Sequence, residues 1–241
     1  MLVRITNRCR MGCRHCLVDG SSRDGAHMST SVFSDCLHFA RRVSEPLILI
    51  SGGEPFEHPS VFSFAERARW EGFLVVVLSN GMFSLDAKML EKVKASNLAI
   101  QVTNDSRYYP FDIDEEALNS VSGVKLERSL RVIFPCARVT KNGIVASHVS
   151  PPCFNFRYAV RQLKNLKLAR LSLVAHGFFC TPSVNVDGSI RLGESDTCCR
   201  VGNVKDSPNK ILCGILEARC NRCGLAKNLS DRQQVALGGM I

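Results

Sequence analysis

The sequence predicts an α/β fold, in which a partial (β/α) barrel is followed by a small C-terminal region built from a β-hairpin and a helix. Short apolar or β-branched runs alternate with amphipathic helical patterns over the first two thirds of the chain, as expected for buried parallel strands joined by helices. Repeated strand–loop–helix units form right-handed crossovers on a parallel sheet. The last third changes to sequence rich in cysteine and turn residues, which favours a separate small region.

The expected elements follow one another in a regular order. Strands are expected at Leu2–Thr6, Leu47–Ser51, Phe73–Ser79, Leu98–Thr103, Leu130–Phe134 and Leu171–Ala175. Helices are expected at Ser29–Val43, Pro59–Gly72, Leu85–Ser96, Asn155–Leu168 and Ser230–Leu237, and a serine caps the first and the last of them. A β-hairpin is expected around Asp187-Gly188, because alternating residues flank a dipeptide that favours tight turns.

Length and composition are those of a globular protein. The chain has 241 residues, of which 45% are hydrophobic and 22% are charged. We expect a barrel domain over residues 1–150 and a second region over residues 151–241.

No apolar run is long enough to cross a membrane and no secretory signal is visible, so we expect a cytoplasmic protein without a membrane partner. The formal net charge of +9 favours an anionic partner, but the dispersed basic residues argue against nucleic acid.

Three cysteines are grouped directly after the first expected strand. Cys9, Cys13 and Cys16 have the spacing C-x3-C-x2-C. An iron–sulfur cubane is normally held by four thiolates, so a set of three would leave one iron open to a second molecule. A structural zinc site needs a fourth ligand, and His15, which lies between two of the cysteines, is poorly placed to supply it. The reducing cytoplasm favours metal clusters over disulfides for a chain with 12 cysteines.

Polar and glycine-rich loops follow the next expected strands. Ser51-Gly52-Gly53-Glu54-Pro55 follows the second strand, Ser79-Asn80-Gly81 the third, and Asn104-Asp105 the fourth. The carboxyl ends of parallel barrel strands meet at one edge, where active sites gather. Glycines allow backbone groups to approach a ligand closely, and Glu54 supplies an acceptor for an ammonium group. These loops therefore predict a ligand site beside the three cysteines.

The three-cysteine loop and the Gly-Gly-Glu-Pro sequence together resemble the signature of the radical S-adenosylmethionine (SAM) enzymes. The resemblance implies a [4Fe-4S] cluster on Cys9, Cys13 and Cys16 and SAM bound at its open iron. It also implies cleavage of SAM to methionine and a 5′-deoxyadenosyl radical, with an electron donor such as flavodoxin or ferredoxin. The residues that it assigns to SAM are Gly52, Gly53, Glu54, Pro55, Ser79, Asn80 and Asn104.

A second group of cysteines surrounds the expected hairpin. Cys180 precedes the hairpin, Cys198 follows it, and Cys220 and Cys223 form a C-x2-C pair. This arrangement is similar to the SPASM domain of radical SAM enzymes, and in particular to its shortened form, the twitch domain. The similarity implies one auxiliary [4Fe-4S] cluster on these four residues, with Cys199 as an alternative to Cys198. A four-cysteine zinc site of similar spacing is the competing interpretation.

The layout also suggests a reaction class. One auxiliary cluster could accept the electron that a substrate radical loses on oxidation, and the compact chain resembles the 2-deoxy-scyllo-inosamine dehydrogenases, which oxidise an alcohol of an aminocyclitol. We therefore expect an oxidoreductase that acts on a small alcohol or cyclitol-like molecule. The alternative is a maturase that introduces thioether links, carbon–carbon crosslinks or epimerised residues into a ribosomally made peptide. A non-catalytic iron–sulfur carrier is disfavoured by the SAM-type loop, and no catalytic base follows from the sequence.

Overall fold

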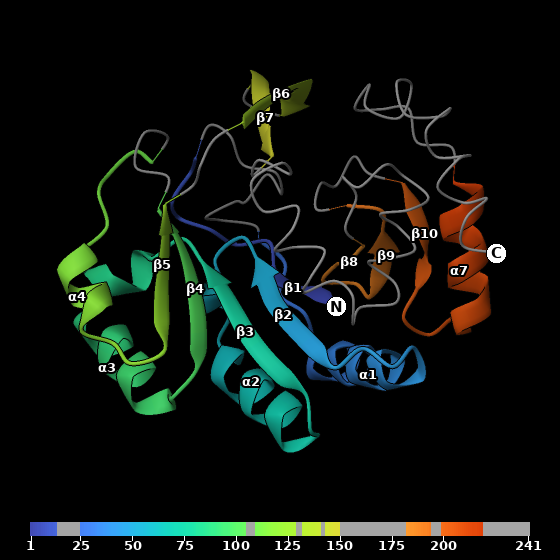
Figure 1. Ribbon diagram of the computed structural model, residues 1–241, viewed down its shortest axis with the longest axis horizontal. Coiled ribbons are helices and arrows are strands. Elements are labelled where there is room, and N and C mark those ends of the chain that lie inside the picture. The colour runs from blue at the N-terminus through green and yellow to red at the C-terminus, as the bar shows by residue number, and fades with distance from the viewer. Residues whose placement is uncertain are drawn as a thin grey trace.

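The main feature of the protein is one open sheet with helices along its outer side (Figure 1). The structure, a computed structural model, describes residues 1–13, 25–104, 109–128, 132–140, 143–149, 182–193 and 199–218, with the backbone alone for 104, 127–128, 132–140 and 143–149. The sheet has eight strands within these residues, in the order β10-β9-β8-β1-β2-β3-β4-β5. It does not close, so the predicted α/β partial barrel is confirmed.

Five neighbouring strands of this sheet run parallel and form the barrel part. They are β1 (Leu2–Thr6), β2 (Leu47–Gly52), β3 (Leu74–Ser79), β4 (Ala99–Asn104) and β5 (Val124–Arg128). The helices between them are α1 (Thr30–Arg42), α2 (Val61–Trp70), α3 (Ala87–Ser96) and α4 (Glu115–Asn119). Parallel pairing brings the carboxyl ends of the strands, and the loops that follow them, to one edge of the sheet.

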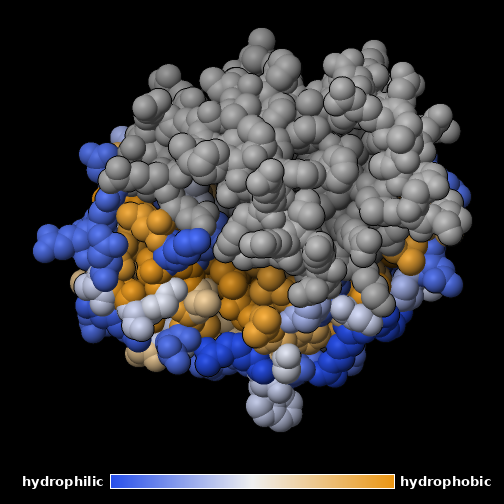
Figure 2. All heavy atoms as spheres, in the orientation of Figure 1, coloured by the Kyte–Doolittle hydropathy of each residue, from blue (hydrophilic) through white to orange (hydrophobic). Residues whose placement is uncertain are grey.

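Apolar side chains of the sheet and the helices form the core. Phe33 of α1 stacks on Phe64 of α2, with ring centroids 4.2 Å apart, and both are buried. The strands contribute fully buried residues such as Ile5 and Ile50. On the face drawn in Figure 2, hydrophobic residues gather across the middle and hydrophilic residues occupy the lower and outer rim. No helix in the described part of the chain is long and apolar enough to cross a membrane.

The barrel part departs from the sequence prediction at its last strand. The fifth parallel strand is β5, which the sequence analysis missed, because Lys125 and Glu127 alternate with apolar residues and hide the strand pattern. β5 is the edge strand of the sheet, where one solvated face is tolerated. The predicted strand Leu130–Phe134 overlaps β6 (Val132–Thr140), which pairs antiparallel with β7 (Gly143–Val149) in a separate two-stranded sheet.

A C-terminal unit extends the same sheet beyond β1. It consists of β8 (Ser183–Val184), β9 (Ser189–Arg191), β10 (Arg200–Asn203) and α7 (Pro208–Glu217). β8 and β9 are antiparallel around Gly188, whose φ of +79° suits glycine, so the predicted hairpin is confirmed. β8 pairs parallel with β1. The expected strand at Leu171–Ala175 and helices at Asn155–Leu168 and Ser230–Leu237 lie outside the described residues, and the division at residue 150 stays a prediction.

Candidate functional site

Three loops meet at the carboxyl edge of the sheet. The cysteine loop (residues 7–13) follows β1, the glycine loop (residues 52–57) follows β2, and a third loop begins at Asn80 after β3. The backbone N–H of Gly53 donates to the carbonyl oxygen of Thr6 at 2.7 Å, and that of Glu54 donates to the carbonyl oxygen of Arg8 at 2.8 Å. The cysteine loop and the glycine loop therefore pair with each other beyond the ends of their strands.

Glycines permit this close approach. A Cβ atom at Gly53 would overlap the carbonyl oxygen of Arg8 and would lie 2.9 Å from Cβ of Cys9. A Cβ atom at Gly52, where φ is +148°, would overlap the carbonyl oxygen of Thr6. On another side of the cysteine loop, Gly25 approaches Arg8 in the same way. The neighbours that require glycine at positions 52 and 53 are thus the backbone of Thr6 at the end of β1 and the backbone of Arg8 in the cysteine loop.

The carboxyl group of Glu54 joins the glycine loop to the loop after β3. Its side chain is buried; Oε1 accepts hydrogen bonds from the Ser79 hydroxyl at 2.9 Å and from the Phe56 N–H at 3.2 Å. Oε2 accepts one from the Asn80 N–H at 2.9 Å. Burial raises the pKa of Glu54 to about 7, and these three donors oppose the rise by favouring the ionised form. Glu54 is therefore a buried acid that a nearby ammonium group would help to ionise.

Glu57 fixes the other side of the cysteine loop. Its side chain is 7% exposed and accepts a hydrogen bond from the backbone N–H of Arg10 at 2.8 Å. The carboxylate also pairs with Nε of Arg8 at 3.4 Å and with Nε of Arg10 at 3.2 Å. Arg8 and Arg10 flank Cys9, so Glu57 holds the segment that carries this cysteine. The sequence analysis missed this role, for which the acidic residue just after Glu54-Pro55 and the two arginines were the available signal.

Two of the three expected cluster ligands lie on the cysteine loop. Cys9 is 7% exposed, and the side-chain amide of Asn80 donates to its Sγ at 3.4 Å. Cys13 is half-buried against the core, and Cys16 lies outside the described residues. Within those residues, no three His, Cys, Asp or Glu side chains are grouped as a metal site. Thiols on one loop with an N–H donor at the sulfur are the ligand chemistry of iron–sulfur clusters, so the residues present fit such a group.

Two histidines lie behind the cysteine loop, and the sequence analysis did not single them out. His58 is buried; its Nδ1 accepts from the Ser60 N–H at 2.9 Å, so the proton is on Nε2, which donates to the Met28 carbonyl at 3.0 Å. Burial lowers the pKa of His58. His27 packs edge-on against it, with ring centroids 4.9 Å apart, and its Nδ1 is 2.9 Å from Thr6 Oγ1. His27 and His58 therefore pack next to Thr6, the residue that precedes the cysteine loop.

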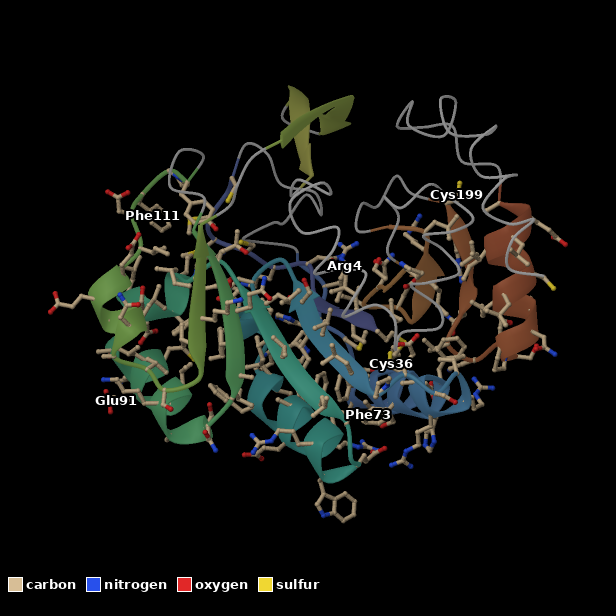
Figure 3. The ribbon with its side chains drawn as sticks, viewed as in Figure 1. Arg4, Cys36, Phe73, Glu91, Phe111 and Cys199 are labelled. Atoms are coloured by element: carbon tan, nitrogen blue, oxygen red, sulfur yellow. The ribbon has the colours of Figure 1, made fainter. Side chains whose placement is uncertain are left out.

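Only some of the other predicted site residues lie in the described part of the chain. Pro55 begins the 3-10 helix η1 (Pro55–Glu57) and is buried, and the backbone of Asn104 ends β4 at the same edge as the three loops. The assigned auxiliary ligands Cys180, Cys198, Cys220 and Cys223 lie outside the described residues. Cys199 is half-buried just before β10, and Figure 3 shows it well apart from Cys36 of α1. Cys36 is fully buried and burial raises its thiol pKa, as expected for a packing residue.

The cysteine loop and the glycine loop are paired at the carboxyl edge of an open sheet, and comparison with known proteins shows where this fold occurs. No family model matches the chain. The structure is similar to that of BtrN in complex with AdoMet and 2-DOIA, with a TM-score of 0.56 at 13% identity over 97% of this chain and 87% of that one. It is also similar to anSMEcpe with bound AdoMet, with a TM-score of 0.53 at 12% identity over 93% and 82% of the two chains. The chain therefore shares its fold with these two proteins, whose structures hold AdoMet.

Curated relatives match a shorter part of the sequence. The AdoMet-dependent heme synthase of Methanosarcina barkeri is 30% identical over 97 residues, which are 39% of this chain and 27% of the relative. The pre-heme d1 synthase of Dinoroseobacter shibae is 26% identical over 136 residues, which are 53% of this chain and 33% of the relative. The chain thus spans about a third or less of the length of these relatives.

Proposed function

We propose that the protein cleaves SAM reductively at a [4Fe-4S] cluster held by Cys9, Cys13 and Cys16. The observation that carries the proposal is the pairing of the cysteine loop with the glycine loop, which brings Gly53 next to Cys9. When bound, such a cluster supplies the electron that cleaves SAM to methionine and a 5′-deoxyadenosyl radical for hydrogen abstraction.

The residues of the chain bind and orient the reactants. The buried Glu54 carboxyl group accepts hydrogen bonds from Ser79 and Asn80. When ionised, it would attract the cationic amino group of SAM. Gly52, Gly53 and Pro55 shape the strand end on which the methionine part of SAM would lie. Asn104, at the end of β4, is the proposed contact for a more distant part of SAM.

The formation of 5′-deoxyadenosine tests this proposal. Anaerobically reconstituted and reduced protein is expected to convert SAM to 5′-deoxyadenosine. Cys13→Ala is expected to abolish the product, because it removes one cluster ligand. Cys36→Ala is the matched control, since this cysteine is buried in α1 away from the loops, and it should retain product formation. Equal product from wild type and Cys13→Ala would refute the assignment.

An auxiliary [4Fe-4S] cluster on Cys180, Cys198, Cys220 and Cys223 is the second part of the proposal. The spacing of these cysteines around the β8–β9 hairpin supports it. Total iron should then approach eight atoms per chain on cubane stoichiometry, on the order of four for each cluster. A variant with Ala at Cys9, Cys13 and Cys16 should keep about half of the iron. A variant of this kind that contained zinc and no iron would favour the structural zinc site.

For the substrate we propose a small alcohol or cyclitol-like molecule that is oxidised with the auxiliary cluster as electron acceptor. Similarity to BtrN, whose structure holds 2-DOIA, over almost the whole chain supports a small molecule. A peptide is the second candidate, because the similar structure of anSMEcpe holds the Cp18Cys peptide. Incubation with deuterated candidates of both kinds separates them: deuterium transferred to 5′-deoxyadenosine marks the substrate whose hydrogen is abstracted.

A further inference from the structure

Asn80 connects all three loops of the site. Its backbone N–H donates to Oε2 of Glu54 at 2.9 Å. Its side-chain Oδ1 accepts from the backbone N–H of Met82 at 2.9 Å, and its Nδ2 donates to Sγ of Cys9 at 3.4 Å. One residue therefore contacts the glycine loop, its own loop and the cysteine loop.

The orientation of the Asn80 amide is fixed by its partners. A backbone N–H can only donate, so the atom that faces Met82 must be the side-chain oxygen. The other end of the amide, which faces Cys9, is then the NH₂ group. A flipped amide would place two donors against each other at Met82 and its oxygen against the sulfur. The contact at Cys9 is thus an N–H···S hydrogen bond.

We infer that Asn80 is a positioning residue that raises the reduction potential of the cluster through this hydrogen bond to Cys9. The inference rests on the proposed function, because it requires that Cys9 ligates the cluster. Hydrogen bonds to the ligating sulfurs are one of the factors that set cluster potentials. A donor stabilises the reduced cluster more than the oxidised one, because the reduced cluster carries more negative charge. The side chain of Asn80 then donates a hydrogen bond to a cluster ligand, whereas the sequence analysis predicted that it contacts SAM.

Two variants at this position isolate the hydrogen bond. Asn80→Ser keeps a short acceptor for the Met82 N–H but is too short to donate to Cys9. Asn80→Asp keeps the shape of the side chain and replaces the donor with an oxygen. Asn119→Asp, on the exposed end of α4, is the control that adds the same charge away from the site.

The midpoint potential of the SAM-binding cluster is the direct measurement. It is followed by EPR at defined solution potentials without SAM, using the signal that shifts when SAM is added to the same sample. Both Asn80 variants should lower the potential, so that the ratio of reduced to oxidised cluster at the wild-type midpoint falls about fivefold, equivalent to ~1 kcal/mol. The Asn119→Asp control should match wild type.

Other outcomes would overturn the inference. A potential that is unchanged in both Asn80 variants would refute the inference. A potential that is lowered in Asn80→Asp alone would leave charge as the only effect and would refute it as well. Unchanged potentials together with weaker SAM binding would show that Asn80 contacts SAM, as the sequence analysis predicted. A wild-type protein with no cluster would refute the proposed function as well, whereas normal clusters with unchanged potentials would refute this inference alone.

Discussion

The two regions on either side of β1 are built in different ways. On the β2 side, the cysteine loop and the glycine loop approach each other through glycines and through hydrogen bonds to the side chains of Glu54 and Glu57. On the β8 side, the C-terminal unit packs through apolar residues such as Ile190, Ile211 and Ile215. The first region depends on polar geometry and the second on apolar burial, so substitutions should affect them differently.

Arg4 links the two regions through β1. It is buried, and Figure 3 shows it near the middle of the molecule. Its guanidinium donates to Oδ1 of Asn185 in the hairpin at 2.8 Å and to Oδ1 of Asn7 in the cysteine loop at 3.1 Å. The strand that carries the cysteine loop is therefore also hydrogen-bonded to the C-terminal unit.

The largest effect on the site is expected from Gly53→Ala, because this variant should lose iron as well as stability. The new methyl group would overlap the backbone of Arg8, which cannot move away as a flexible side chain could. We expect loss of most of the iron bound by the cysteine loop and destabilisation of about 3 kcal/mol, within the range of overpacking. Iron analysis and chemical denaturation measure both effects. Gly72→Ala is the control for iron binding, since nothing lies within 4 Å of its Cβ position, whereas its φ of +89° means that some loss of stability is expected there too. Equal iron loss in both variants would contradict the loop pairing.

The C-terminal unit should respond to loss of apolar volume. Ile211 of α7 is fully buried, so Ile211→Ala is expected to cost 2–5 kcal/mol, about the usual range for such truncations. Formation of 5′-deoxyadenosine should persist at temperatures where the variant stays folded. Leu216→Ala on the same helix, where the side chain is 54% exposed, should change stability by less than about 0.5 kcal/mol. Loss of SAM cleavage in folded Ile211→Ala would show that the regions are not separable.

Glu54 should give the glycine-loop region a distinct pH dependence. Its pKa is raised from 4.5 to about 7 in the folded protein, so the folded state binds the proton more tightly than the unfolded state. Stability from this group is present below pH 4.5 and is lost as the pH rises to about 7, by roughly 3 kcal/mol. Denaturation at several pH values should show this fall in wild type and not in Glu54→Gln. Parallel curves would mean that Glu54 stays ionised throughout.

The smallest effect is expected at the surface contact between the regions. Lys205 of the C-terminal unit lies 3.6 Å from Asp35 of α1, and the lysine side chain is 72% exposed. Exposed pairs of this kind contribute about 0–1 kcal/mol. Lys205→Ala should therefore change the free energy of unfolding by less than about 1 kcal/mol at moderate salt. A larger loss in denaturation experiments would show that charge, in addition to apolar packing, joins the C-terminal unit to α1.

The sequence predicted elements whose pattern is local. β1 to β4 are short runs rich in apolar and β-branched residues, α1 begins at its Ser29 cap, and Asp187-Gly188 marks the hairpin. β5 was missed because charged residues alternate along an edge strand. The contacts of Glu57 and Asn80 with the cysteine loop were not predicted, because each joins loops that are far apart in the chain. The predicted C-terminal cluster ligands stay predictions, since they lie outside the described residues.

The contrast between the two regions is tested most directly by 5′-deoxyadenosine and oxidised product measured together in two variants. Cys13→Ala should lose both, because it removes a ligand of the SAM-binding cluster. Replacement of Cys220 and Cys223 by Ala should leave 5′-deoxyadenosine formation largely intact and prevent the oxidised product, because the proposed electron acceptor is lost. Full product yield from the second variant, or SAM cleavage by the first, would contradict this division of roles.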